Sequence, residues 1–355
     1  MKRKVLFVFL ALTLTAVLVV DACAQKGKPI ELAFAMEAAS THTRVTRVFT
    51  PWAKMIQERS KGQVKIVPYY ANALAPRPEN YNAVVKGIAD MGQCNLGGIA
   101  GRFPILEILH LPGVGMDTST TASKTMWRLY KKFPCVQAEV ADTHVITLFS
   151  YGSFGVMSAK RPVHKVEDLK GLKLWSQGKP RNNTCKALGA VPVSMPMNDA
   201  YMAIEKGVLD GLLTDYTLLT SRKMGEVVKH VTIGTSLGCA PFYLVMNKKR
   251  WNSLPPDVQQ VFNDLGGEWL AEHVGGTFDL LRVETEKEWA GKVEFYSLPP
   301  AEAERWVERL APPRDEYVAF LEKKGVPAKE LVAEMIAAGK EFGGAKGRIF
   351  PAPQP

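Results

Sequence analysis

The sequence predicts an α/β protein with two domains. Apolar segments of strand length alternate along the chain with amphipathic segments of helical period, a pattern typical of sheets covered by helices. This alternation starts near residue 30 and starts again near residue 151. With 355 residues, the chain is also longer than a single hydrophobic core usually organises. We therefore expect two α/β units in succession.

The first unit opens with a strand at 30–36. The next segment, 45–56, has apolar residues at i, i+3, i+4 and i+7 spacing and is followed by Gly62, which predicts a helix. The later elements are a strand at 64–70, a helix at 79–86, a strand at 90–94, a helix at 121–132 and a strand at 144–151. The order β-α-β-α-β at the start of this unit predicts the beginning of a parallel sheet.

The second unit follows Tyr151. A Lys-Gly turn precedes a short strand at 173–175, and a polar loop that contains Arg181 then leads to a helix ending at Gly189. The later elements are an apolar strand at 191–195, a helix from 197 to Gly207, a strand near 210–211 and another at 242–247. Residues 257–343 have a mostly helical pattern, interrupted by a strand at 293–296.

The N-terminus has the three parts of a secretory signal peptide. Three basic residues at positions 2–4 precede an apolar run at 5–20, and Ala22-Cys23-Ala24 matches a small-residue cleavage site. An apolar run of about 16 residues is short for a membrane span, which needs about 20. We expect export to the periplasm with cleavage near Ala24. Lipidation of Cys23 is the alternative, and Asp21 favours ordinary cleavage.

Composition and motifs exclude several classes of function. The formal charge is +10, and +8 without residues 1–24, which carry three basic residues and one acidic residue. Basic and acidic residues are interspersed, so nucleic acid is not an expected partner. The four later cysteines form no C-x-x-C pair and the histidines are scattered, so we expect no metal site and no cofactor. One disulfide or four thiols both remain open. None of the nucleophile-elbow, zinc-protease or phosphate-loop motifs occurs, which favours binding over catalysis.

Four short motifs between residues 168 and 211 resemble the DctP family, the extracytoplasmic solute receptors of TRAP (tripartite ATP-independent periplasmic) transporters. They are DLKGLKLW at 168–175, ALGA at 187–190 followed by Pro192, YMAI at 201–204, and GVLDG at 207–211. A fifth, FPILEILHLP at 103–112, also resembles the family's pattern. The resemblance covers about residues 32–322. Trp175 departs from it, because the family usually has at this position an arginine that binds a carboxylate.

The resemblance implies a periplasmic-binding-protein-like fold with a ligand cleft between two domains and a long helix spanning both. The implied domains are 25–150 with about 243–280, and 151–242 with about 281–322. Residues 323–355 would form a C-terminal helix and tail. The implied function is capture of a small organic solute, most often an organic acid, by domain closure, followed by delivery to a TRAP permease. We expect a monomer and no enzymatic activity. A secreted enzyme on the same scaffold is the alternative from another class.

Trp175 is the first candidate for ligand contact. Its indole has one N–H donor and no charge, so it cannot replace a guanidinium. The ring could stack on the ligand, or it could fill space between the domains while another cation binds the acid. Arg181, six residues later, is the nearest candidate for that cation.

The remaining candidates end strands or follow them, where ligands sit in open α/β sheets. Asp215, with Trp175 and Phe154 opposite, would suit an amine or an aromatic solute, which is the alternative ligand class. Asp215 could instead cap the helix that starts near residue 218. The other residues expected around the cleft are Tyr151, Glu37, Asn95, Thr214, Tyr216 and Phe242.

Overall fold

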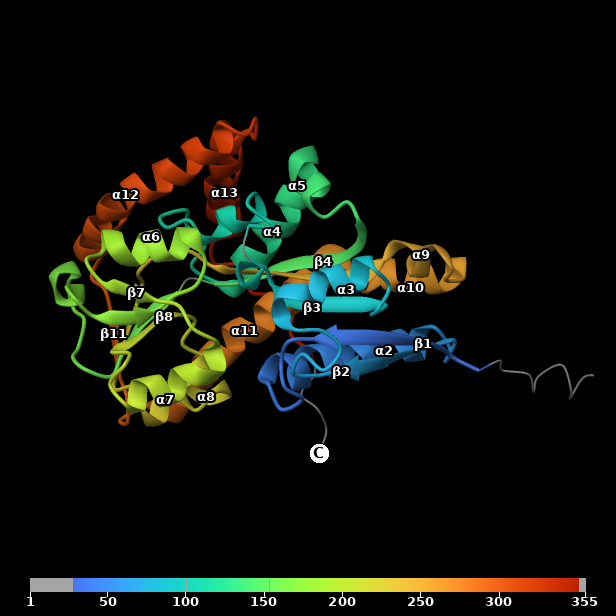
Figure 1. Ribbon diagram of the computed structural model, residues 1–355, viewed down its shortest axis with the longest axis horizontal. Helices are drawn as coiled ribbons and strands as arrows, with labels where there is room; N and C mark the ends of the chain where they lie inside the picture. Colours follow the sequence, from blue (N-terminus) through green and yellow to red (C-terminus); the bar gives the residue numbers. More distant parts are fainter. Residues whose placement is uncertain (1–27, 100, 153, 351–355) are drawn as a thin grey trace, which may run out of the picture.

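A computed structural model describes residues 28–99, 101–152 and 154–350 of the chain. The predicted signal peptide lies outside the described residues. Two β-sheets, each covered by helices, form two domains that lie side by side (Figure 1). Within the described ranges, no helix is both long enough and apolar enough to cross a membrane.

The sheet of the first domain has five strands in the order β2-β1-β3-β10-β4. These strands are β1 (Ile30–Met36), β2 (Val64–Tyr69), β3 (Met91–Asn95), β4 (Thr143–Tyr151) and β10 (Ala240–Asn247). The parallel pairing predicted for the start of the chain is present, because β1 pairs in parallel with β2 and with β3. The prediction fails beyond β3. There β10, from almost 150 residues later in the chain, inserts antiparallel between β3 and β4.

The sheet of the second domain has six strands in the order β11-β9-β5-β8-β6-β7. They are β5 (Gly155–Ser158), β6 (Lys173–Trp175), β7 (Val191–Val193), β8 (Gly211–Thr214), β9 (His230–Ile233) and β11 (Glu294–Ser297). The strands β7, β6 and β8 pair in parallel, as expected for the β-α-β-α-β segment. Strand β5 is antiparallel to both β8 and β9. Neither β5 nor β9 was expected from the sequence, since both are short.

Helices cover both sheets. The α-helices are α2 (Thr50–Arg59), α3 (Asn80–Val85), α4 (Ser119–Lys132), α5 (Pro134–Glu139), α6 (Lys179–Ala187), α7 (Ala200–Glu205), α8 (Leu218–Ser221), α9 (Lys248–Asn252), α10 (Pro256–Asp264), α11 (Gly267–Trp289), α12 (Pro300–Glu322) and α13 (Ala328–Phe342). Shorter turns of helix are η1 (Val45–Phe49), η2 (Arg77–Glu79), η3 (Leu96–Gly98), η4 (Leu106–His110), η5 (Val166–Leu169), η6 (Met197–Asp199) and η7 (Met224–Glu226).

Helix α11 joins the two domains. It packs on α4 and β4 in the first domain and on α8 in the second. Gly275 and Gly276 lie inside this helix, where a Cβ atom would be 2.5 Å from the backbone of Thr120 and 2.2 Å from the carbonyl oxygen of Arg348. The two glycines therefore permit close packing along an uninterrupted helix.

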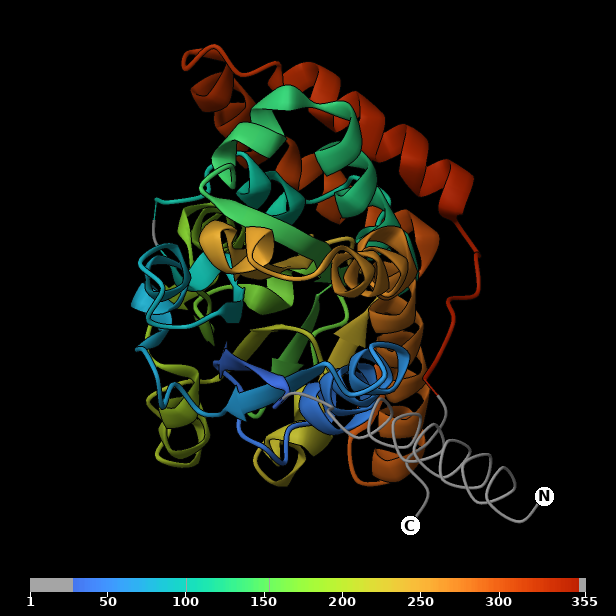
Figure 2. The ribbon, with the colours of Figure 1, turned by 90° about the vertical axis from the view of Figure 1, so that its right-hand side faces the viewer.

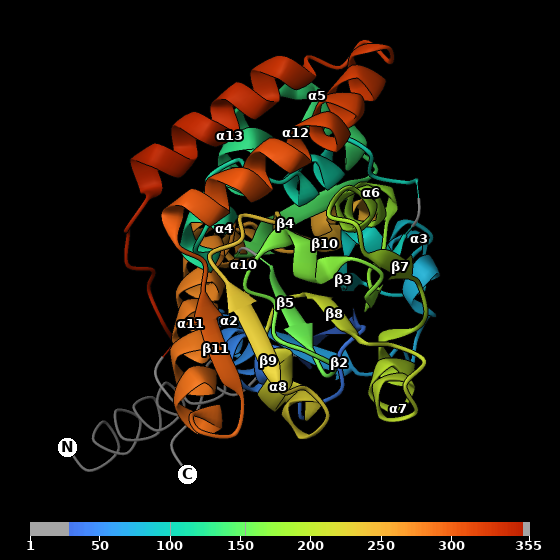
Figure 3. The ribbon, with the colours of Figure 1, turned by 90° about the vertical axis from the view of Figure 1, so that its left-hand side faces the viewer.

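The C-terminal part of the chain also contacts both domains. Helix α12 packs on α6 of the second domain, and α13 packs on α4 of the first. Residues 343–350, which we call the C-terminal strap, leave the end of α13 and run beside α11 (Figures 2 and 3). The strap ends with the buried ring of Phe350 edge-on to Trp269 at 5.8 Å.

Candidate ligand-binding cleft

A cavity of about 520 Å³ lies between the two domains, and both contribute to its walls. Glu37, Asn95 and Tyr151 stand at or just after the carboxyl ends of β1, β3 and β4. Trp175 and Thr214 hold the equivalent places at the ends of β6 and β8. The strand ends of both sheets thus meet at one site, which is where ligands bind in α/β folds.

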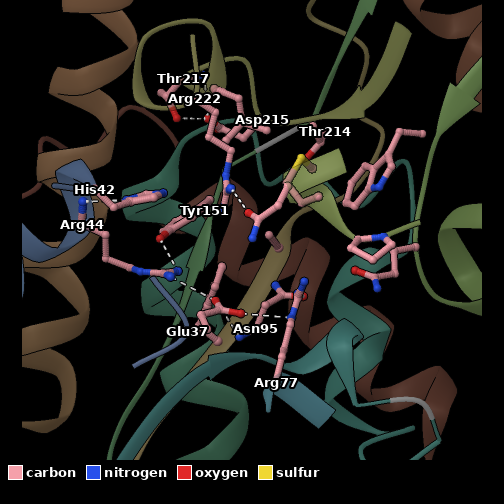
Figure 4. Close-up of a pocket in the computed structure, with 18 of the residues that line it drawn as sticks. Glu37, His42, Arg44, Arg77, Asn95, Tyr151, Thr214, Asp215, Thr217 and Arg222 are labelled. Carbon is pink, nitrogen blue, oxygen red and sulfur yellow. Dashed lines mark hydrogen bonds and ion pairs between the residues drawn. The ribbon is translucent and has the colours of Figure 1, made fainter. Parts of the chain in front are cut away.

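The wall from the first domain is organised around the carboxylate of Glu37. Its Oε1 is 3.0 Å from Nη2 of Arg44, and its Oε2 is 3.0 Å from Nε of Arg77. It also accepts a hydrogen bond from the backbone N–H of Asn95 at 3.1 Å. Burial alone would raise the pKa of Glu37, but the two arginines outweigh it and lower the pKa to about 2. The carboxylate is therefore ionised and fixes both guanidinium groups (Figure 4).

Other nitrogens of the same two guanidinium groups donate hydrogen bonds to neighbouring side chains. Arg44 donates from Nη1 to the hydroxyl of Tyr151 at 2.9 Å, and Arg77 donates from Nη2 to Oδ1 of Asn95 at 3.2 Å. Arg44 enters the site just before η1, and Arg77 opens η2 between two prolines that limit its backbone. The centre of the Phe242 ring lies 4.7 Å from the guanidinium carbon of Arg44. The arginines are thus held in place without any ligand.

Arg181 is the main cation on the wall from the second domain. The expected polar loop ends earlier than predicted, because Gly178 adopts a positive φ of 88° and helix α6 starts at Lys179, with Pro180 in its first turn. Arg181 therefore lies in the first helical turn and is only 3 % exposed. Its guanidinium carbon is 4.3 Å from the ring centre of Phe154 and 5.7 Å from that of Trp175.

A buried polar cluster lies behind Arg181. Nη2 of Arg181 is 3.0 Å from Nε2 of His110. Burial, and then the charge of Arg181, keep the pKa of His110 well below its usual range, so the imidazole is neutral and its Nε2 accepts this hydrogen bond. Burial and the charge of Arg77 likewise lower the pKa of Arg181 to about 9, which leaves it charged at neutral pH.

Trp175 is fixed by its own hydrogen bond. The indole Nε1–H donates to the carbonyl oxygen of Met195 at 2.9 Å, and the side chain is almost fully buried. The ring therefore braces the wall segment 194–198 and also contacts Arg181. Both expected roles of Trp175, filling space and lining the cleft, are compatible with this position.

Asp215 does not stand as a separate acid in the cleft. Its Oδ2 is 2.7 Å from Nη2 and 3.1 Å from Nε of Arg282 on α11, and its Oδ1 accepts from the N–H of Thr217 at 2.9 Å. Phe154 lies behind Arg181, and Tyr216 turns away to donate to Glu286 at 2.6 Å. The acid-and-aromatic arrangement expected for an amine ligand is therefore not formed.

Arg222 is a further cation of the cleft, which the sequence reasoning missed. It follows helix α8 and donates from Nη1 to Oδ1 of Asn198 at 2.7 Å. Burial, and then the charge of Arg44 across the cleft, lower its pKa. His42 lies beside Arg44 on the wall from the first domain. Burial, and then the charges of Arg44 and Arg222, lower the pKa of His42 to about 3, so it is neutral. Figure 4 shows Arg222 approaching Arg44 from the opposite wall.

Most of the predicted site residues come together at the cavity. Eight of the ten line it, namely Trp175, Arg181, Asp215, Tyr151, Glu37, Asn95, Thr214 and Phe242. The two others, Phe154 and Tyr216, lie outside the lining. Arg44, Arg77 and Arg222 were not predicted. Arg77 could have been predicted as a site residue, since it lies in the loop after the carboxyl end of β2. Arg44 could not, because it precedes a helix whose polar residues are typical of an ordinary protein surface.

The described residues contain no group of three or more histidine, cysteine or acidic side chains placed to hold a metal ion. The thiols of Cys94, Cys135, Cys185 and Cys239 are free in this structure.

Comparison with known proteins gives consistent matches. The family model described as bacterial extracellular solute-binding protein, family 7 (DctP), matches residues 34–319. A solute-binding protein of Albidiferax ferrireducens is 29% identical over 62% of this chain and 66% of its own length. The C4-dicarboxylate-binding periplasmic protein of Rhodobacter capsulatus is 33% identical over 53% of this chain and 54% of its own. The alignments thus span between half and two thirds of these relatives.

The fold is also found among solved structures. A TRAP solute-binding protein from Rhodoferax ferrireducens, in complex with copurified benzoate, superposes with a TM-score of 0.82. It is 24% identical, and the match covers 88% of this chain and 98% of that one. This likeness establishes the two-domain fold of a periplasmic binding protein.

Proposed function

Because this chain belongs to the DctP family of bacterial extracellular solute-binding proteins, we propose that it captures a small organic acid and delivers it to a TRAP permease. Binding is the whole of its activity, as in the family's other receptors, with no chemical step. The two domains close on the acid around α11, and the closed form is the one presented to the membrane subunits. We further propose that it acts as a monomer in the periplasm, after removal of the leader near Ala24.

One observation carries the choice of an acid as ligand. Arg44, Arg77, Arg181 and Arg222 all line the cavity, and Arg282 stands directly behind Asp215. The carboxylates among the described lining residues are those of Glu37 and Asp215, and both are already in ion pairs. Cations left without a carboxylate partner in a buried site are stabilised by an anionic ligand.

We assign the family's missing carboxylate contact to Arg181. Trp175 occupies the usual position of the arginine on the strand, but the guanidinium of Arg181 reaches the cavity from helix α6, beside the indole of Trp175. Among the described residues, no hydrogen-bond acceptor meets its Nε. A planar guanidinium supported on two rings is suited to bidentate binding of a carboxylate.

A thermal-shift screen of the mature protein tests this function. At about a hundred times its dissociation constant, a bound acid should stabilise the protein by roughly 2.7 kcal/mol, whereas amines should not. Arg181→Gln should abolish the shift. Lys179→Gln removes a charge from the same helical turn outside the cavity lining and should preserve it. Stabilisation by amines and not by acids would overturn the proposal.

A further inference from the structure

A buried acid, Glu107, lies behind the guanidinium of Arg181. Glu107 and His110 are three residues apart in η4, which forms within the segment FPILEILHLP. Side chains three residues apart in a 3-10 helix lie on the same side of it. His110 accepts its hydrogen bond from Nη2 of Arg181 at 3.0 Å, and neither His110 nor Glu107 lines the cavity. Both residues therefore act on Arg181 from the side that faces away from a ligand.

Glu107 has few groups that stabilise its ionised form. The side chain is buried, and its one hydrogen bond among the described residues joins Oε2 to the hydroxyl of Tyr317 at 3.4 Å. The same hydroxyl is 2.8 Å from the carbonyl oxygen of Pro104. A phenol has one hydrogen to donate, so these two acceptors share it. Ionised Glu107 is therefore short of donors, whereas protonated Glu107 can itself donate to the oxygen of Tyr317.

The charged and titratable groups around Glu107 come from four elements. Burial raises the pKa of Glu107 to about 7, against the hydrogen bond of Tyr317 on α12 and the charge of Arg181 on α6. Glu139 on α5 has its pKa raised by burial and, more weakly, by the charge of Glu107. His110, on η4 itself, is neutral. In this part of the described structure, Arg181 is thus the cation that favours ionised Glu107.

A carboxylate bound in the cavity competes with Glu107 for the charge of Arg181. Once the guanidinium holds the ligand, repulsion from the ligand offsets the attraction that favours ionised Glu107, so the buried carboxyl group binds a proton more readily. The effect is reciprocal. Protonation of Glu107 removes the competing anion and strengthens the binding of the ligand by Arg181.

We propose that binding of an acid at Arg181 is coupled to uptake of a proton by Glu107, with His110 positioning the guanidinium between the two anions. The proton comes from the solvent and forms an O–H bond on the carboxylate of Glu107, and no other covalent bond forms or breaks. Glu107 and His110 therefore act on the ligand through Arg181. This proposal rests on the proposed function, because it requires an acid at Arg181.

Calorimetric titration in two buffers tests the coupling. The probes are benzoate, lactate and pyruvate, which stay ionised between pH 6 and pH 8 because carboxylic acids titrate near pH 4. At pH 7.5, proton uptake by the wild type should make the binding enthalpy differ between phosphate and Tris, whose heats of ionisation differ. Glu107→Gln should give the same enthalpy in both buffers. Glu316→Gln, which removes an exposed acid next to Tyr317, should behave as the wild type.

The pH profile of the affinity gives a second measurement. The ligand raises the pKa of Glu107 above the value of about 7 in the empty protein, so the proton is taken up mainly above pH 7. From pH 6 to pH 8, the wild-type affinity should fall about threefold to tenfold, since one coupled proton changes it at most tenfold per pH unit. The affinity of Glu107→Gln should stay nearly constant. Tyr317→Phe removes the donor to Glu107 and should move the decline to higher pH.

Variants of His110 separate positioning from coupling. His110→Phe keeps a ring but loses the acceptor for Arg181, so the affinity should fall at every pH. His110→Gln provides a side-chain carbonyl and should recover part of the loss. An equal loss in both variants would show that the hydrogen bond does not position Arg181.

Two results would overturn the coupling and leave the acid receptor intact. They are equal wild-type enthalpies in the two buffers, and a buffer dependence that persists in Glu107→Gln. Unchanged pH profiles in both Glu107→Gln and Tyr317→Phe would do the same, so the test does not depend on one variant. Failure of all three probes to bind at any of these pH values would instead overturn the proposed function.

Discussion

The carboxylate of Asp215 is bound by the guanidinium of Arg282, with Oδ2 2.7 Å from Nη2 and 3.1 Å from Nε. Both side chains are buried. Asp215 follows β8 in the second domain, and Arg282 lies on α11, so the ion pair ties the floor of the cleft to the helix that joins the domains.

The first prediction concerns this pair. Arg282→Gln leaves the carboxylate of Asp215 buried without its cation, so we expect the free energy of unfolding to fall by about 3–5 kcal/mol. Urea unfolding monitored by circular dichroism measures the change. Arg305→Gln is the control, because it breaks an ion pair with Glu167 on the surface and should leave the urea midpoint unchanged. Equal midpoints for Arg282→Gln and wild type would contradict the assigned role.

The second prediction concerns Trp175. Trp175→Ala removes the ring beside Arg181 and frees the carbonyl of Met195, so the affinity for the bound acid should fall by about 1–3 kcal/mol. Calorimetric titration gives the affinity. Trp175→Phe keeps an aromatic ring and should recover part of the loss. If a folded Trp175→Ala protein binds as tightly as wild type, the ring has no part in the site.

The third prediction concerns pH and Glu107, which lies in the buried cluster with His110 and Arg181. Burial raises the pKa of Glu107 to about 7, against a partial opposing effect of its hydrogen bond from Tyr317 and of Arg181. Between pH 4.5 and 7, the unfolded chain loses this proton while the folded chain keeps it. The contribution of Glu107 to stability therefore declines as pH rises through that window.

Glu107→Gln cannot titrate and should escape this decline. Relative to wild type, the variant should gain about 1–3 kcal/mol of unfolding free energy between pH 4.5 and pH 7.5. Urea denaturation at both pH values measures the difference, and the effects of groups that do not interact with Glu107 cancel in the comparison. Removing the charge of Glu107 also lowers the pKa of Glu139, which adds to the gain of the variant at the higher pH. A constant difference between the two proteins at the two pH values would show that Glu107 titrates normally.

The fourth prediction concerns the C-terminal strap. A methyl group at Gly276 would lie 2.2 Å from the carbonyl oxygen of Arg348, and backbone atoms cannot yield as a flexible side chain can. Gly276→Ala should therefore displace the strap from α11. Hydrogen exchange should become faster at residues 345–350, and the packing of Phe350 on Trp269 should be lost. Gly291→Ala is the control: its φ of 75° strains the backbone, but no atom lies within 4 Å of its Cβ, so it tests whether a general loss of stability alone speeds exchange in the strap. Unchanged exchange in Gly276→Ala would refute the close contact.

The order of elements could be predicted from the sequence because it depends on local patterns. Strand β1 has the predicted bounds, and α4 and β10 begin within two residues of theirs. The insertion of β10 between β3 and β4 could not be predicted, since strand order is decided by packing between segments far apart in the chain. Strands β5 and β9 are four residues each, too short for a clear period.

In the candidate site, too, local sequence patterns could be predicted and contacts between distant segments could not. Glu37, Asn95 and Thr214 could be placed because each ends a strand or follows one, and strand ends meet at the ligand site. Their partners could not. The pairing of Asp215 with Arg282 joins residues 67 positions apart, and the approach of Arg222 to Arg44 depends on how the two domains face each other.

The surplus of guanidinium groups in the cleft also has a kinetic consequence. Low-dielectric walls concentrate the field of several like charges at the mouth of a cavity, and this field draws oppositely charged solutes toward it before any contact is made. Salt shortens the reach of such a field to about 8 Å at physiological ionic strength. The capture rate should therefore fall steeply as salt increases, while the lifetime of the closed complex changes little. In dilute surroundings the protein would collect its solute fastest.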